Sequence, residues 1–241
     1  MGIKEKILQI LFPKTCPICG DILEKGREIC PECKQRLIYI REPKCKKCGK
    51  PFDKREYDSQ TREYCGDCTK LPHSYEHGMA VFRYNEEIRE SIFRFKYHNQ
   101  RTYADFYGKE MAKSYGRYIQ SLGIEVIIPV PLSKKKRRNR GFNQAELMAN
   151  ICGKQLGIPV DCGKLLRFRD TVPQKELNHI ERRKNLKNAF IIEKNDVKYK
   201  KILLVDDIYT TGSTIDACAE MLRQDGAEKV YFISLSIGAG I

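Results

Sequence analysis

Four CxxC pairs in the first 68 residues constrain the fold of this chain more than any other feature of its sequence. A C-x2-C turn presents two thiolates to a single tetrahedral ion, so two pairs complete one four-cysteine metal site. A redox CxxC is expected at a helix start after a strand, and disulfides are expected after a secretory signal, and neither setting is visible here. The sequence therefore predicts two structural zinc sites, whose eight ligands are Cys16, Cys19, Cys30, Cys33, Cys45, Cys48, Cys65 and Cys68.

The spacing of the pairs leaves two ways of sharing them between the ions. In sequential ligation the first two pairs bind one zinc and the last two bind the other, whereas a cross-braced module interleaves them. We favour the sequential arrangement, because its loops of 10 and 16 residues close locally and lose less chain entropy. In either case residues 1–70 contain too little apolar material for a core of their own, so each metal is expected to contribute on the order of 10 kcal/mol to folding.

A linker at residues 70–74 separates this module from a second region, residues 75–241, in which cysteine is rare. The three remaining thiols, Cys152, Cys162 and Cys218, have apolar neighbours and are interpreted as buried small hydrophobic residues. Strand and helix patterns alternate along this region, as they do in parallel α/β domains. The patterns predict helices at 86–97, 101–122, 143–156 and 214–223, and strands at 78–84, 124–130, 189–192, 201–205 and 229–235.

The segment 201–214 is the most informative part of the second region. Four apolar residues lead into Asp206 and Asp207, and a central strand of this kind brings both carboxylates to the edge of the sheet where α/β proteins bind ligands. The turn that follows offers hydroxyls and backbone N–H groups at a helix N-terminus, which suits an anion. An acidic turn with a Ser/Thr helix cap is the simpler alternative. The residues of the turn are Thr210, Thr211, Gly212, Ser213 and Thr214.

A hydrophobic strand, two acids and a TTG turn together resemble the signature of the type I phosphoribosyltransferases. The resemblance implies an α/β fold with a central, mostly parallel sheet flanked by helices. It also implies that Asp206 and Asp207 hold the ribose hydroxyls of phosphoribosyl pyrophosphate, that the turn at 210–214 cradles the 5′-phosphate, and that Mg²⁺ accompanies the ligand.

A wider resemblance runs along almost the whole chain. The four CxxC pairs and the segments 95–97, 129–132, 140–147 and 174–190 are similar to the ComF family of competence-associated proteins, which combine a double zinc ribbon with a phosphoribosyltransferase domain. The block Arg-Gly-Phe-Asn-Gln-Ala-Glu-Leu at 140–147 is the most specific element of this likeness. Membership of that family would associate the chain with DNA uptake.

The segment 133–144 carries six positive charges and no acid, and we expect it to form a basic loop beside the sugar-phosphate site. A solvated loop or a nucleic-acid patch are the alternatives. By resemblance, the pyrophosphate contacts fall within residues 133–138, and Lys96 is a further candidate for contacting the phosphates or the acceptor. A second loop at 169–187 is expected to act as a lid, with a plain surface loop as the alternative. The candidates in the basic loop are Ser133, Lys134, Lys135 and Arg138.

Two functions of different class follow. The first is an enzyme that transfers phosphoribosyl to an unknown amine or base. The second is a non-catalytic protein that binds single-stranded DNA or a competence helicase and only senses phosphoribosyl pyrophosphate. The formal charge of +14 points first to a pyrophosphate-bearing substrate and only second to nucleic acid, because two four-thiolate zinc sites remove most of the basicity of residues 1–75 and leave the excess in the second region. Without a signal peptide or an apolar run of about 18 residues, the expected location is the cytoplasm.

Overall fold

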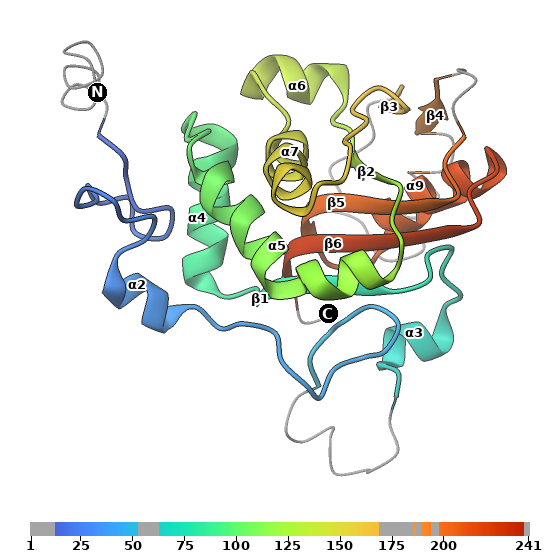
Figure 1. The fold of residues 1–241 in the computed structure, drawn as a ribbon, viewed down its shortest axis with the longest axis horizontal. Coiled ribbons are helices and arrows are strands. Elements are labelled where there is room, and N and C mark those ends of the chain that lie inside the picture. Colours follow the sequence, from blue (N-terminus) through green and yellow to red (C-terminus); the bar gives the residue numbers. More distant parts are fainter. Residues whose placement is uncertain (1–12, 53–62, 169–185, 187–188, 194–197, 239–241) are drawn as a thin grey trace.

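The computed structural model describes residues 13–52, 63–168, 186, 189–193 and 198–238, which are built around a four-stranded sheet (Figure 1). The strand order is β1-β6-β5-β2, and each of the three neighbouring pairs is parallel. This topology confirms the predicted α/β class with a parallel central sheet. The strands are β1 (Gly78–Arg83), β2 (Val126–Pro129), β5 (Lys201–Tyr209) and β6 (Lys229–Ile237).

Helices cover both faces of this sheet. On β5, Leu203 and Val205 belong to the same core as the buried residues of α4 (Glu86–Tyr97), α5 (Tyr103–Ser121) and α7 (Gln144–Leu156). The alternate residues Ile202 and Leu204 belong to a second core with α9 (Ser213–Gln224). Successive side chains of a strand point to opposite faces, so the two cores are the two sides of one sheet (Figure 1). None of the described helices combines the length and apolar composition needed to cross a membrane.

β5 is longer than its apolar run predicts. The strand continues past Val205 to Tyr209, because parallel pairing with β6 persists through Asp206 and up to the last residue. The two acids therefore lie within the hydrogen-bonded ladder and not in the turn after it. This placement gives the carboxylates a rigid backbone at the carboxyl end of a central strand.

The basic segment is a helix, so the prediction of a loop at this position is wrong. α6 (Lys134–Arg140) begins after Ser133, whose side chain accepts a hydrogen bond from the Lys136 N–H (3.4 Å). It ends at Gly141, whose φ of 76° is the left-handed conformation that glycine adopts most readily. Lysine and arginine are good helix formers, and a serine cap and a glycine stop were both present in the sequence.

A separate two-stranded antiparallel sheet pairs β3 (Leu165–Arg167) with β4 (Phe190–Ile192). β4 matches the strand predicted at 189–192, but it does not join the central sheet. β3 was not predicted, because three residues are too few for a clear period-two pattern.

The cysteine-rich region wraps around the edge of the central sheet. Between its two halves, Ile40 N–H donates to the Val81 carbonyl (2.9 Å) and Arg83 N–H donates to the Ile38 carbonyl (2.8 Å), which covers the free edge of β1. The first half contains α2 (Pro31–Arg36) and packs into the core with α4 and α5. The second half contains α3 (Gly66–Lys70) and packs into the core with α9. The cysteine-rich region is thus supported by the sheet as well as by its own thiol clusters.

Candidate functional site

The eight cysteines form two clusters in sequential order, which is the arrangement that loop entropy favoured. Cys16, Cys19, Cys30 and Cys33 make up the first cluster, and Cys45, Cys48, Cys65 and Cys68 make up the second. Sulfur atoms lie 3.7 Å apart between Cys19 and Cys30 and 3.7 Å apart between Cys48 and Cys65. A tetrahedral zinc with Zn–S bonds of about 2.3 Å separates its sulfurs by about 3.8 Å, whereas a disulfide bond is about 2 Å long. The donor geometry therefore fits zinc.

Hydrogen bonds to the sulfurs support the same interpretation. The Arg36 guanidinium donates to Cys33 Sγ (3.1 Å), and the Cys65 backbone N–H donates to Cys45 Sγ (3.3 Å). Donors of this kind stabilise metal-bound thiolates and fix their orientation. With four thiols in each cluster, no position is left for a reacting water, so the two sites have a structural role.

The paired acids on β5 point to opposite faces of the sheet. Asp207 Oδ2 forms an ion pair with Lys96 Nζ on α4 at 2.6 Å, and both side chains are largely buried. Asp206 lies on the α9 side, where burial and then the negative charge of Asp207 raise the pKa of its carboxyl to about 7. Lys96 and Arg167 oppose this shift only in part. Lys96, which the sequence suggested as a contact for phosphates or acceptor, is thus paired with the acid motif.

The turn after β5 forms a small cavity at the N-terminus of α9. Residues 208–215 line it together with Asp206, and its volume is about 30 Å³. Gly212 caps the helix with a φ of 78°, and the Thr211 and Ser213 hydroxyls lie 3.0 Å apart. Backbone N–H groups and hydroxyls at the start of a 12-residue helix, beside a partly buried carboxyl, suit a phosphate that carries a hydroxylated group.

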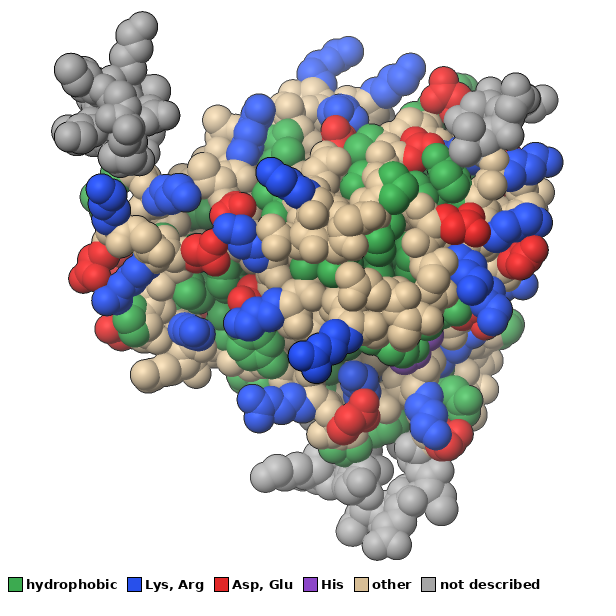
Figure 2. Space-filling view, viewed as in Figure 1, with side chains coloured by type: hydrophobic (Ala, Val, Ile, Leu, Met, Phe, Trp, Pro, Cys, Tyr) green, Lys and Arg blue, Asp and Glu red, His purple; other side chains and the backbone are tan. Residues whose placement is uncertain are grey.

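The basic candidates are not among the residues that line this cavity. Ser133 is buried and occupied in capping α6, while Lys134, Lys135 and Arg138 are exposed along the same helix. Figure 2 shows lysine and arginine side chains projecting from the surface over α6. The lid predicted at 169–187 falls outside the described residues except for Leu186.

Two other residues of the basic block, Arg140 and Gln144, contact each other beside Tyr97, the neighbour of Lys96 in α4. The Arg140 guanidinium lies over the Tyr97 ring (5.0 Å) and donates to the side-chain oxygen of Gln144 (3.1 Å). Gln144 is 1% exposed, and its amide nitrogen has no hydrogen-bond partner among the described residues. The sequence reasoning passed over both residues, although the Arg-Gly-Phe-Asn-Gln block had been singled out.

The start of α7 is tied to the strand that carries the acids. Asn143 caps α7 by accepting from the Ala145 N–H (3.2 Å), and its amide donates to the Val130 carbonyl (3.0 Å). Val130 N–H in turn donates to the carbonyl of Val205, the residue before Asp206 (2.9 Å). The N-terminus of α7, the N-terminus of α9 and the two carboxylates therefore meet at one edge of the sheet.

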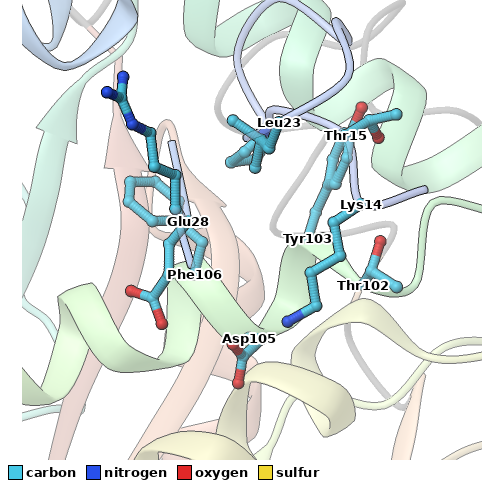
Figure 3. A pocket seen from close by; sticks show the side chains of 10 residues that line it. Lys14, Thr15, Leu23, Glu28, Thr102, Tyr103, Asp105 and Phe106 are labelled. Atoms are coloured by element: carbon cyan, nitrogen blue, oxygen red, sulfur yellow. The ribbon is translucent and has the colours of Figure 1, made fainter. Parts of the chain in front are cut away.

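A larger cavity of about 210 Å³ lies elsewhere, between the first cysteine cluster and α5 (Figure 3). Figure 3 shows the Lys14 side chain reaching toward Asp105 on α5, with Phe106 and Leu23 nearby. None of the predicted site residues lines this larger cavity. The edge of the sheet at the end of β5 is therefore the better candidate site, although its cavity is smaller.

Comparison with known proteins agrees with this arrangement. Residues 7–69 match the family model of a double zinc ribbon domain, and residues 143–236 match that of a phosphoribosyl transferase domain. The second match includes both acids and the turn that follows them. The fold is therefore that of the type I phosphoribosyltransferases with an added N-terminal zinc ribbon region.

Full-length relatives share both regions. Competence protein F of Haemophilus influenzae is 33% identical over 232 residues, which cover 93% of this chain and 97% of that protein. DNA utilization protein YhgH of Escherichia coli O157:H7 is 29% identical over 225 residues, covering 92% and 96%. Among solved structures, purine phosphoribosyltransferase from Pyrococcus horikoshii has a TM-score of 0.34 and 20% identity, covering 56% of this chain and 72% of that one.

Proposed function

The chain belongs to the ComF family of competence-associated proteins, and from this membership we propose that it binds phosphoribosyl pyrophosphate with Mg²⁺ at the end of β5 and transfers phosphoribosyl to an amine or a base. The observation that carries the proposal is the cavity in which Asp206 adjoins the turn that opens α9. A carboxylate and an anion-binding helix N-terminus, side by side, match a sugar phosphate, whose hydroxyls donate hydrogen bonds and whose phosphate accepts them.

Each part of the ligand has a partner in this arrangement. The turn at 210–214 would hold the 5′-phosphate through its N–H groups and hydroxyls. Asp206 and Asp207 would accept hydrogen bonds from the ribose hydroxyls. Bound Mg²⁺ would neutralise charge on the pyrophosphate, and carboxylate oxygens are ligands that this ion accepts.

The pyrophosphate group is assigned to the start of α7. Cleavage of its bond to the sugar leaves negative charge on the departing group, which preorganised donors must stabilise. The Gln144 amide nitrogen lies in the first turn of α7, and Arg140, the last residue of α6, contacts the same side chain, so both are donors on the same edge of the sheet as the acids. The exposed lysines of α6 would add long-range attraction for an anion more than direct contacts.

Calorimetric titration with phosphoribosyl pyrophosphate and Mg²⁺ tests the binding step. We expect saturable binding by the wild type and none by the Asp206→Ala/Asp207→Ala double variant. Glu220→Gln, an exposed position on α9, is the control and should bind as the wild type does. Equal affinity of the double variant and the control would remove the proposed site.

A separate experiment tests transfer. Phosphoribosyl pyrophosphate labelled in the pentose is incubated with the protein and cell extract, and the products are screened by mass spectrometry. A labelled pentose on a new acceptor is the expected result and identifies that acceptor. Hydrolysis alone, or no protein-dependent change, would leave binding without transfer.

Binding of single-stranded DNA is the second candidate function, and one surface favours it. Phe93 and Tyr97 on α4 are 53% and 58% exposed, and Arg140 stacks on Tyr97 next to the cationic helix α6. Exposed aromatic rings beside cations are what single strands bind, through base stacking and phosphate contacts.

Affinity for a single strand, measured over a series of salt concentrations, tests this second function. We expect the affinity to fall steeply as salt rises and to fall again in Tyr97→Ala. A flat salt response, or an unchanged affinity in the variant, would argue against this surface.

A further inference from the structure

The linker between the cysteine-rich region and the sheet is hydrogen-bonded to the first turn of α9. His73 Nδ1 lies 2.8 Å from Asp216 Oδ2, and the Ser74 backbone N–H donates to Asp216 Oδ1 (2.9 Å). The N–H of Asp216 donates in turn to the carbonyl of Gly212 (2.8 Å). The linker thus holds the same turn whose residues line the candidate phosphate cavity.

The His73 contact is buried and polar. The side chain of His73 is 1% exposed and that of Asp216 is 10% exposed. Because a carboxylate only accepts, His73 Nδ1 carries the proton in this bond. A hydrogen bond to a charged acceptor is stronger than one between neutral groups, and this one joins residues 143 positions apart in the sequence.

Tyr75 contacts the residue that directly precedes the turn. Its ring is 1% exposed, and its hydroxyl lies 2.8 Å from the hydroxyl of Tyr209, the last residue of β5. The Tyr209 ring stacks on Phe232 with ring centres 4.8 Å apart and 6° between the planes. A Cβ atom at Gly212 would lie 2.5 Å from Tyr209 Oη, so the tyrosine hydroxyl supports the backbone of the turn directly.

The other side of Tyr75 faces the second cysteine cluster. Lys47, between the first two thiols of that cluster, places its Nζ 5.4 Å from the centre of the Tyr75 ring. Its carbonyl accepts from the N–H of Gly78, the first residue of β1 (2.8 Å). Tyr75, Tyr209 and three thiols of the cluster also share one buried core. A continuous series of contacts therefore runs from the cluster through Tyr75 and Tyr209 to Gly212.

We propose that His73 and Tyr75 are positioning residues that hold the turn at 210–214 in its anion-binding conformation. We further propose that the second cysteine cluster, packed in the same core as Tyr75, supports them. The ligand part of this inference rests on the proposed function. The conformational part rests on the contacts alone.

Removal of one hydroxyl tests the inference. Tyr75→Phe keeps the ring and deletes only the bond to Tyr209. Tyr39→Phe is the matched control, because Tyr39 donates a similar hydrogen bond to Glu110 (2.6 Å) away from the turn. Two quantities are measured: the backbone amide NMR signals of residues 211–213 without ligand, and the affinity for phosphoribosyl pyrophosphate with Mg²⁺.

We expect Tyr75→Phe to shift the turn signals and to weaken binding about three- to tenfold, which is the range that one lost hydrogen bond supports. The loss of binding free energy in the Tyr75→Phe/Tyr209→Phe double variant should be less than the sum of the losses caused by Tyr75→Phe and by Tyr209→Phe alone, because the two hydroxyls bond each other. Tyr39→Phe should change neither quantity. If Tyr75→Phe does not fold, His73→Leu replaces it and should shift the turn signals, whereas His73→Asn keeps a donor for Asp216 and should restore them.

Turn signals at their wild-type positions in Tyr75→Phe would overturn the inference, and so would equal shifts in Tyr75→Phe and Tyr39→Phe. Absence of any binding by the wild type would instead refute the proposed function. In that case the ligand-free spectra would still decide whether the linker positions the turn.

Discussion

Asparagine in place of Asp206 should stabilise the folded protein at neutral and alkaline pH, and the gain should shrink as the pH falls. Burial and the adjacent Asp207 raise the pKa of Asp206 from 3.8 to about 7. A carboxyl with a raised pKa favours the folded state while it is protonated, below about pH 4. That contribution is lost progressively as the pH rises from about 4 to 7, because over this range the unfolded chain ionises the group freely whereas the folded chain keeps it protonated. Asparagine keeps the size of the side chain and carries no charge at any of these pH values.

The size of the effect follows from the pKa difference. A shift from 3.8 to about 7 corresponds to about 4 kcal/mol over the whole pH range. Acid below pH 5.5 also protonates thiolates that hold metal, so the useful window is pH 5.5 to 8. Within it, the unfolding free energy of the wild type should fall by about 2 kcal/mol relative to Asp206→Asn, with most of the change below pH 7.

Urea denaturation followed by far-ultraviolet circular dichroism measures this difference at each pH. Comparing variant and wild type in the same buffer cancels the contributions of the other titrating groups and of the metal sites. Glu220→Gln, exposed on α9, is the control and should stay within about 0.5 kcal/mol of the wild type throughout. A wild-type to Asp206→Asn difference that does not change with pH would refute the argument that this carboxyl is buried beside a like charge.

Three further changes test other parts of the structure. Gly212→Ala should cost about 1–3 kcal/mol in urea denaturation and weaken ligand binding, because its φ is positive and its Cβ would meet Tyr209 Oη; a stable variant with unchanged affinity would contradict the turn geometry. Lys96→Met should cost about 2 kcal/mol, since it leaves Asp207 largely buried without its cation, and a neutral effect would argue against that ion pair. Elemental analysis should find two zinc ions per chain and one after Cys45→Ala, whereas two ions in the variant would contradict the sequential clusters.

Local sequence signals predicted the parts of the site that lie on single elements. The apolar run before Asp206 predicted β5, and the small residues after it predicted the turn and α9. The loops between CxxC pairs predicted the order of the clusters, because short loops close at a low entropy cost. The same local logic, applied to the Ser133 cap and the Gly141 stop, would have predicted α6, but six positive charges within seven residues drew attention to charge over helix propensity.

Contacts between distant residues could not be predicted in this way. Lys96 and Asp207 are brought together by the packing of α4 on the sheet. Tyr75 and Tyr209 are brought together by the path of the linker that leads into β1. Neither pair leaves a pattern in the sequence, since each partner is an ordinary residue of its own segment. The edge pairing of residues 38–40 with β1 is likewise invisible without the fold.

The most direct test is calorimetric titration of the wild-type protein with phosphoribosyl pyrophosphate, in the presence and in the absence of Mg²⁺, with ribose 5-phosphate as a second ligand. We expect one site per chain, tighter binding with Mg²⁺, and weaker binding of ribose 5-phosphate, which can use the turn and the acids but lacks the pyrophosphate. No heat of binding for either ligand, with a folded protein that retains its zinc, would contradict the assignment of this sheet edge as a phosphoribosyl site.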